Sequence, residues 1–202
     1  MKSNRVRFLL AVAATAAALT ACTPTGTAAV VGGERISSAE LNENIAAVKR
    51  EAAAINADID APEALPAALP QVVLNHLVLI RQSEQLARRD GITVTESEID
   101  QQIKRYEDAY QMPFDQLAPR VGIPRARIRE WMRAQVVQNK VAPRLGINEQ
   151  TTENEAMQKL DEALNAAAPV TWNPRYGKRV GLEGRFEMPE RFGAADTGGD
   201  EE

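Results

Sequence analysis

Apolar side chains recur at intervals of three and four residues over most of the chain, and this spacing predicts amphipathic helices packed around a core. Ser37 and Glu40 have the spacing of a capping box, which begins a helix. Thr95 and Glu98 repeat that spacing shortly after Gly91, a residue typical of helix ends. The pattern predicts six helical segments, at residues 37–55, 66–89, 95–111, 114–121, 125–141 and 152–165.

The second of these segments is the most apolar in the chain. Apolar residues form one face of it and also cover much of its remaining circumference. A helix of this kind is buried on several sides, so we expect it at the centre of the fold. Its apolar positions are Leu69, Val72, Val73, Leu74, Leu77, Val78, Leu79 and Ile80.

Two short β-prone runs lie far apart in the chain, at residues 29–31 and 170–172, and the turn signal Gly32-Gly33 follows the first. An isolated strand leaves backbone groups without hydrogen bonds, so the two runs are expected to pair with each other. The sequence therefore predicts a mainly α-helical domain in which two short terminal strands pair.

The N-terminus has the order of a secretory signal peptide. A basic start precedes an uncharged apolar run from Phe8 to Leu19, which is shorter than the roughly 20 residues of a membrane span. The tetrad Leu19-Thr20-Ala21-Cys22 resembles the lipobox of bacterial lipoproteins, and Cys22 is the only cysteine. This resemblance implies cleavage before Cys22, a diacylglycerol on its thiol, and a lipid-anchored protein on the extracytoplasmic face of the cell membrane. An ordinary cleaved signal peptide followed by a chance cysteine is the alternative.

Four segments follow from these patterns: a signal peptide at 1–21, a flexible tether at 22–28, a helical domain at 29–180, and an acidic tail at 181–202 that we expect to be disordered. The chain of 202 residues has 24 basic and 28 acidic side chains. Without the signal peptide 21 basic side chains remain, which gives a net charge of −7. This balance disfavours a nucleic-acid partner, and we expect none.

His76, the only histidine, lies on the apolar stripe of the second predicted helix. We interpret it as a packed side chain with a hydrogen-bonding neighbour, and a proton switch or a ligand is the alternative. No second histidine accompanies it, so a zinc site has no support. Asp58 and Asp60 lack the rest of an EF-hand loop, and the acids at 96–100 suit the first turn of a helix. No catalytic motif occurs, so we expect no enzymatic activity, no cofactor and no metal.

Five arginines gather around the helix predicted at 125–141. They form either a basic patch for anionic lipid or acidic protein segments, or a solvated helix face. They are Arg120, Arg125, Arg127, Arg129 and Arg133.

The same helix has Trp131 beside Met132, a pair suited to binding varied apolar polypeptide segments where it lines a groove. Ordinary core packing is the alternative, because Ile128 lies on the same stripe. Ile128 itself, with Tyr106 and Tyr110 of the preceding helix, completes the five candidate binding residues.

Three motifs carry a family resemblance. Residues 30–37 (VVGGERIS) resemble the V-N-G-E-x-I-T segment of SurA-type and PrsA-type extracytoplasmic folding factors, with Gly32 where the family often has Asn. Residues 91–99 (GITVTESEI) resemble their G-I-x-V-T-x-x-E-I link, and residues 169–177 (PVTWNPRYG) resemble the V-x-V-N-P-R-Y-G ending of lipoproteins with a SurA N-terminal-like domain. Nothing after Gly177 resembles a parvulin prolyl-isomerase domain. The resemblance therefore implies the chaperone part of the family without its enzyme part.

The leading hypothesis is a membrane-tethered holdase, which binds unfolded exported polypeptides without catalysis. The first alternative is an envelope lipoprotein that docks one specific protein or lipid partner through the arginine patch. A domain accessory to a separate isomerase is a further alternative. The sequence leaves open whether two copies pair as a homodimer.

Overall fold

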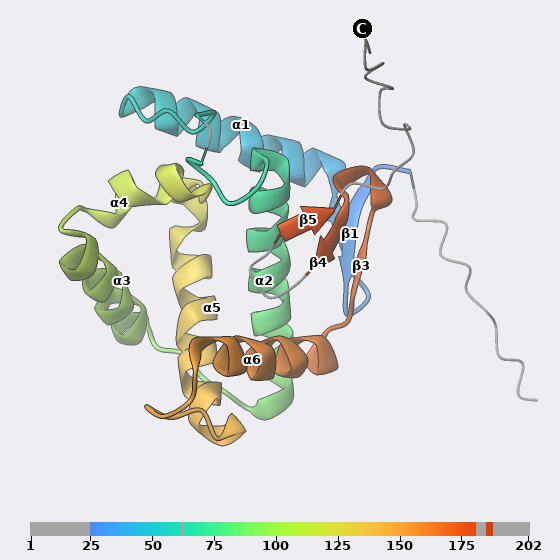
Figure 1. Cartoon of the computed structure of the whole chain (residues 1–202), viewed down its shortest axis with the longest axis vertical. Coiled ribbons are helices and arrows are strands. Elements are labelled where there is room, and N and C mark those ends of the chain that lie inside the picture. The colour runs from blue at the N-terminus through green and yellow to red at the C-terminus, as the bar shows by residue number, and fades with distance from the viewer. Residues whose placement is uncertain (1–24, 62, 181–184, 188–202) are drawn as a thin grey trace, which may run out of the picture.

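The computed structural model describes residues 25–61, 63–180 and 185–187. Within these residues the fold is mainly α-helical, as the sequence predicts, with a small antiparallel sheet at one side (Figure 1). The helices are α1 (Ser38–Ala54), α2 (Leu69–Asp90), α3 (Glu96–Tyr110), α4 (Phe114–Leu117), α5 (Ile128–Val141) and α6 (Glu153–Ala167). The strands are β1 (Thr27–Val31), β2 (Glu34–Ser37), β3 (Val170–Trp172), β4 (Lys178–Val180) and β5 (Arg185–Glu187). Short 3₁₀ turns are η1 (Ala118–Val121), η2 (Arg125–Arg127), η3 (Ala142–Leu145) and η4 (Pro174–Tyr176).

Helix α2 is central, as its apolar circumference predicts. In Figure 1 it runs vertically, with α1 across its upper end, α6 across its lower end and α5 alongside. Leu74 and Leu86 are fully buried within it. Pro70 lies in its first turn, where no backbone N–H is needed. Gly91 ends it in the left-handed conformation, and its amide donates to the Ala87 carbonyl.

The predicted helix starts differ in how completely they form. At α3, Thr95 makes both hydrogen bonds of its capping box. At α1, Ser37 Oγ accepts from the Glu40 amide at 3.0 Å. The Glu40 carboxylate, however, lies 3.4 Å from Arg81 and 3.5 Å from Arg127. The box at α1 is therefore half formed, because ion pairs with α2 and η2 hold the glutamate.

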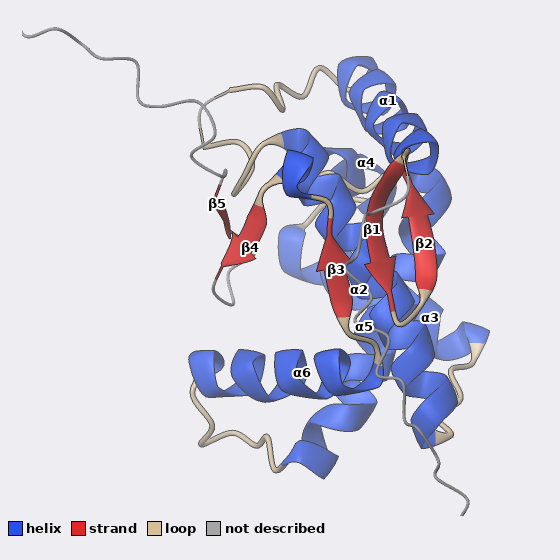
Figure 2. Cartoon of the chain, turned by 90° about the vertical axis from the view of Figure 1, so that its right-hand side faces the viewer, coloured by secondary structure: helices blue, strands red, loops and turns tan. Residues whose placement is uncertain are grey.

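The two predicted terminal strands pair with each other. β1 and β3 are antiparallel with Val30 opposite Thr171, which joins the first and last parts of the domain. β2 adds a third strand that the sequence pattern did not predict, and the strand order is β2-β1-β3 (Figure 2). The four residues of β2 were interpreted as a turn and a helix cap, because only Ile36 among them is buried.

Gly32, in the turn between β1 and β2, lies against α2. Its φ is +53°, and a Cβ built there would overlap Gln85 Oε1 and lie 2.7 Å from Gln85 Cδ. Gln85 Nε2 in turn donates to the Val31 carbonyl at 2.8 Å. The glycine therefore suits both the left-handed turn and the close approach of Gln85, whose side-chain amide would have to move to admit a Cβ at this position.

The structure also bears on the predicted segment boundaries. Thr27 and Ala28, the last residues of the predicted tether, belong to β1 and are fully buried. Residues 185–187 of the predicted tail form β5, which pairs with β4, and Phe186 contacts Trp172 with ring centroids 5.4 Å apart. The signal peptide at 1–21, Cys22 and the rest of the tail lie outside the described residues.

The apolar core has three parts. One lies between the sheet, α1 and the first half of α2. A second joins α3, α4 and α5, and a third lies where α2, α5 and α6 meet.

Candidate functional site

The five candidate binding residues come from α3 and α5, and four of them, Tyr106, Ile128, Trp131 and Met132, share one apolar cluster with Phe114. We call the rings that contact one another here, those of Tyr106, Tyr110, Phe114, Trp131 and His76, the aromatic cluster. Tyr106 contacts Trp131 and Phe114 edge to face, with centroids 5.5 Å apart in both pairs. Tyr110 stacks on Tyr106 at 6.2 Å.

Their exposure differs. Met132 is fully buried, Ile128, Trp131 and Tyr106 are half-buried, and Tyr110 is 59% exposed. Tyr110 is therefore the member with the largest surface for a partner, while Met132 is part of the core. Contact with unfolded polypeptides stays a prediction for all five.

His76 connects this cluster to α2. Its ring meets Trp131 edge to face at 6.2 Å, and its Nε2 lies 2.9 Å from the Val121 carbonyl. Because a carbonyl only accepts, the Nε2 of a neutral ring donates in this bond. Burial lowers the pKa of His76, which keeps the ring neutral. The interpretation of a packed and hydrogen-bonded histidine agrees with this geometry.

Three hollows with apolar side chains in their lining lie in a row along α2. The α1 hollow, about 390 Å³, lies between α1, the loop 55–68 and the first turn of α2. The middle hollow, about 250 Å³, is lined by Val72, His76 and Val121, and it shares Leu65 with the α1 hollow. The α6 hollow, about 230 Å³, shares Asn75 with the middle hollow.

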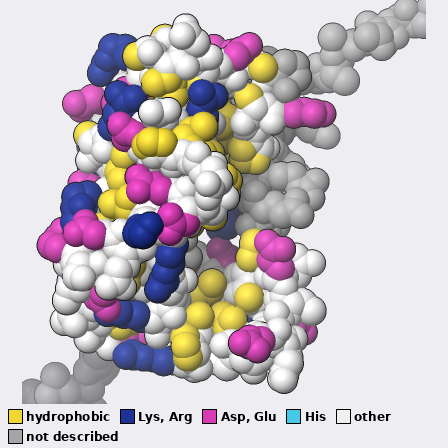
Figure 3. Space-filling model, turned by 90° about the vertical axis from the view of Figure 1, so that its left-hand side faces the viewer, with side chains coloured by type: hydrophobic (Ala, Val, Ile, Leu, Met, Phe, Trp, Pro, Cys, Tyr) yellow, Lys and Arg dark blue, Asp and Glu magenta, His cyan; other side chains and the backbone are white. Residues whose placement is uncertain are grey.

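Apolar side chains of both α2 and α6 line the α6 hollow. Leu79 of α2 faces Met157 and Leu160 there, and all three are half-buried. Figure 3 shows the molecule hollowed above its lower part, where α6 lies, with hydrophobic side chains gathered along the hollow. An ion pair between Arg179 and Asp161, 2.8 Å long, lies at its rim.

Sequence reasoning did not predict these hollows as candidate binding sites. A signal was present, because α6 has a narrow apolar stripe and α2 has more apolar positions than one face can bury. The pattern could not tell which of these positions a neighbouring helix covers.

The arginine patch is largely paired with acids. Arg127 contacts Glu130 at 2.6 Å as well as Glu40, and Arg133 lies 2.6 Å from Glu96. Arg129 bridges Glu96 and Asp100 of α3. These pairs join α5 and η2 to α1 and α3, so much of the positive charge of the patch is already neutralised.

The same contacts perturb the acids of α3. Hydrogen bonds from Arg129 lower the pKa of Glu96. Hydrogen bonds from Lys140 and from the Thr95 backbone lower the pKa of Glu98 to about 2. The acids at 96–100 thus pair with α5 and cap α3, as the helix-start interpretation predicts.

Neither a metal-binding cluster nor a membrane-spanning helix is present among the described residues. They include no group of three or more His, Cys, Asp or Glu side chains placed to hold a metal ion. In the same part of the chain, no helix has the length and apolar character of a membrane span.

Comparison with known proteins gives one match. The model of the family described as SurA-like N-terminal domain matches residues 6–121, more than half of the chain. No curated protein and no solved structure matches the chain. The matched part includes the α1 hollow, and α5, α6 and β3 lie beyond it.

Proposed function

From the premise that this chain belongs to the family of SurA-like N-terminal domains, a non-catalytic, chaperone-type domain, we propose that it is a holdase for unfolded exported polypeptides. The row of three adjoining hollows along α2, each with apolar side chains in its lining, is the observation that carries this proposal. Membership of the family by itself supports the chaperone type and does not specify what is bound.

The row has the dimensions of an extended peptide. From Leu69, in the α1 hollow, to Gln82, in the α6 hollow, α2 advances 13 residues, or roughly 20 Å at 1.5 Å per residue. An extended chain advances about 3.3 Å per residue, so about six residues span that length. Side chains spaced along such a segment would enter the three hollows, and different kinds of apolar side chain could occupy each of them.

The lining of the row suits a tolerant binder. Leu79, Met157 and Leu160 present flexible aliphatic surface, and methionine adapts to partners of different shape. Each apolar side chain buried there gains roughly 1.5–3 kcal/mol, and the ordering of an unfolded client offsets much of that gain. Affinity for any one segment is therefore modest, which is compatible with release.

A location at the membrane belongs to the same proposal. Cleavage before Cys22 and attachment of two acyl chains would hold the domain at the extracytoplasmic face, where exported chains emerge unfolded. A Cys22→Ala variant should leave the membrane fraction, and its retention after a high-salt wash would contradict the anchor.

The competing proposal of a docking lipoprotein rests on free positive charge in the arginine patch. The ion pairs of Arg127, Arg129 and Arg133 with acids of the same domain reduce that charge. They therefore favour the holdase over recognition of an acidic partner by this patch.

Aggregation of several unrelated unfolded proteins tests the proposal. The chain from Thr23 to Glu202 contains every described element and should suppress aggregation at near-stoichiometric concentration. Met157→Glu, which places a charge in the α6 hollow, should raise the concentration required about fivefold, because it removes at least one apolar contact.

Asn154→Glu is the matched control, since it adds the same charge to an exposed position of the same helix. Equal thermal stability of both variants would show that the hollow, rather than the fold, is affected. Failure of the unmodified and folded protein to protect any client would refute the holdase proposal.

A further inference from the structure

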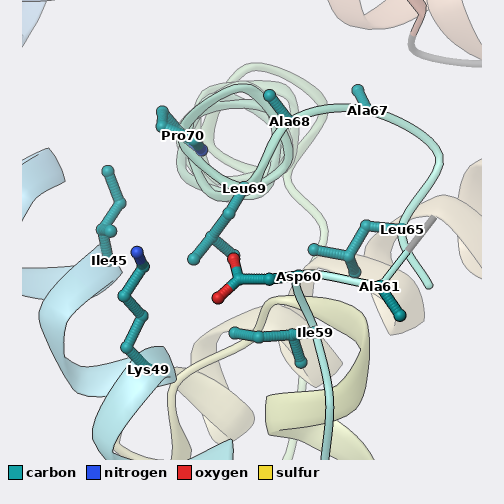
Figure 4. A pocket seen from close by; sticks show the side chains of 10 residues that line it. All are labelled: Ile45, Lys49, Ile59, Asp60, Ala61, Leu65, Ala67, Ala68, Leu69 and Pro70. Atoms are coloured by element: carbon teal, nitrogen blue, oxygen red, sulfur yellow. The ribbon is translucent and has the colours of Figure 1, made fainter. Parts of the chain in front are cut away.

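The α1 hollow has one cation and one anion at its mouth that make no ion pair with any described residue, unlike Arg179 and Asp161 at the rim of the α6 hollow. Lys49 extends from α1, and Asp60 extends from the loop that follows it (Figure 4). Ile59, Leu65 and Leu69 lie around the space between them. All the remaining lining side chains are aliphatic, alanine or proline.

The two charged groups are not used by the fold. Both residues are exposed, and among the described residues neither the Lys49 ammonium nor the Asp60 carboxylate has an ion-pair partner. The Asp60 backbone amide, by contrast, bonds to Asp58 Oδ1 at 3.2 Å and fixes the loop at that point. Elsewhere in the domain most charges near the surface hollows are paired, as Arg179 is with Asp161.

The donors and acceptors at the mouth match those of a peptide unit. An ammonium offers only donors and a carboxylate only acceptors, whereas each peptide unit has one C=O acceptor and one N–H donor. A main chain that crosses the mouth can therefore accept from Lys49 and donate to Asp60, while its side chain enters the apolar space below.

We propose that the α1 hollow is an anchor site for one large apolar side chain of an extended polypeptide, with Lys49 and Asp60 holding the backbone of that residue. The inference rests on the proposed holdase function and specifies how one end of the α2 row binds its client. Because the backbone is the same in every protein, such an anchor selects a client segment by the size of one apolar side chain and by its extended conformation, and not by its particular sequence.

The charges at the mouth favour a peptide over other apolar ligands. A fatty acid would place its carboxylate near Lys49 but also near Asp60, and an apolar amine would meet the opposite conflict. A neutral peptide unit satisfies both groups without repulsion. The volume of about 390 Å³, some 13 times that of a liquid water molecule, accommodates a leucine or phenylalanine side chain.

The position of the anchor at the end of the row has a consequence for register. Leu65 separates the α1 hollow from the middle hollow, so a residue held by Lys49 and Asp60 places the following residues along α2. The anchor thus orders the client on the domain, and the other two hollows add apolar contact.

The test uses the chain from Thr23 to Glu202 and short, uncharged, terminally blocked peptides with one central leucine among serines and threonines. Backbone amide shifts of the protein would be followed by NMR. We expect saturable shifts around Ile45, Ile59 and Leu69. Methylation of the leucine backbone nitrogen, which removes the N–H that Asp60 accepts, should weaken binding about threefold to tenfold, and methylation two residues away should not.

Three variants separate the charge from the space. Lys49→Met keeps the aliphatic stem and removes the ammonium, and it should weaken binding about threefold to tenfold. Arg50→Met, which removes the neighbouring exposed charge on α1, is the control and should leave the affinity unchanged. Ala67→Phe fills the hollow and should abolish the shifts while the rest of the spectrum stays folded.

The outcomes distinguish this inference from the proposed function. Equal binding by Lys49→Met and Arg50→Met, or saturation of the same amides by a fatty acid but not by the peptide, overturns the anchor. Suppression of client aggregation that depends on Met157 but not on Lys49 would overturn the anchor and leave the holdase intact. Absence of suppression by the unmodified protein would refute both.

Discussion

Replacement of Gly32 by alanine should destabilise the domain more than its place in a surface turn would suggest. The φ of +53° alone disfavours a Cβ by about 1–2 kcal/mol. The added methyl would also displace Gln85, whose amide then loses its 2.8 Å hydrogen bond to the Val31 carbonyl, at about 1 kcal/mol. The total, about 2–3 kcal/mol, corresponds to a fall of about 4–12 °C in Tm for a domain of this size.

Gly33→Ala is the matched control, because Gly33 also has a positive φ, +87°, but no atom lies within 4 Å of a Cβ built there. Urea unfolding of Gly32→Ala, Gly33→Ala, Gln85→Ala and the double variant of Gly32 and Gln85 would measure each free energy. In the Gln85→Ala background, the Gly32 substitution should cost no more than Gly33→Ala does in the wild type. An additive cycle, with a coupling below about 0.3 kcal/mol, would refute the contact between the turn and α2.

Three further predictions concern the terminal strands and the titratable groups. Asn173→Ala removes the 2.6 Å hydrogen bond to the Thr27 carbonyl and should lower the free energy of unfolding by about 1–2 kcal/mol in thermal melts. Because the pKa of Glu98 is lowered from 4.5 to about 2, its ionised carboxylate stabilises the fold at pH values above 4.5, and this contribution is lost as the pH falls toward 2. In urea titrations Glu98→Gln should therefore lower the stability clearly at pH 6 and hardly at pH 2. The pKa of His76 is lower in the folded than in the unfolded chain, so on acidification the unfolded chain takes up the proton at a higher pH, and the free energy of unfolding should fall as the pH drops below 6.5. His76→Gln should abolish this pH dependence.

Each of these has a result that would contradict it. Unchanged stability of Asn173→Ala would mean that the strand pairing does not depend on that side chain. An equal loss of stability in Glu98→Gln at both pH values would show that the ion pair between Glu98 and Lys140 is not the cause of the loss. A proton titration of the His76 ring centred at or above 6.5 in NMR would disprove its burial as the dominant influence on its pKa.

Features fixed by neighbours in sequence were predicted well. The box at Thr95 and the stop at Gly91 need only groups within four or five residues, so the local sequence contains the whole interaction. At Ser37 only the hydrogen bond from the Glu40 amide to the Ser37 side chain forms, because the Glu40 carboxylate pairs instead with Arg81 and Arg127, which are distant in sequence. The pairing of residues 29–31 with 170–172 was also predictable, since unpaired backbone groups in both runs required partners.

The candidate site was predictable only in part. The helical stripes marked Trp131 and Tyr106 as candidate binding residues, but they could not show that the two rings contact each other, or that Met132 is fully buried while Tyr110 is mostly exposed. Exposure at the edge of an apolar stripe depends on how far the next helix diverges, and that distance is set by packing rather than by spacing.

By itself, the sequence determined approximately where the helical segments lie, that α2 is central, that two remote strands close the domain, and that Cys22 ends a lipobox-like tetrad. Only the tertiary structure decided that α6 lies across α2 and leaves Leu79 and Leu160 open to one hollow, and that Lys49 and Asp60 face a common mouth. The reason is that hydrogen bonds and periodic burial act over a few residues, whereas a hollow exists only where elements distant in sequence fail to fill the space between them.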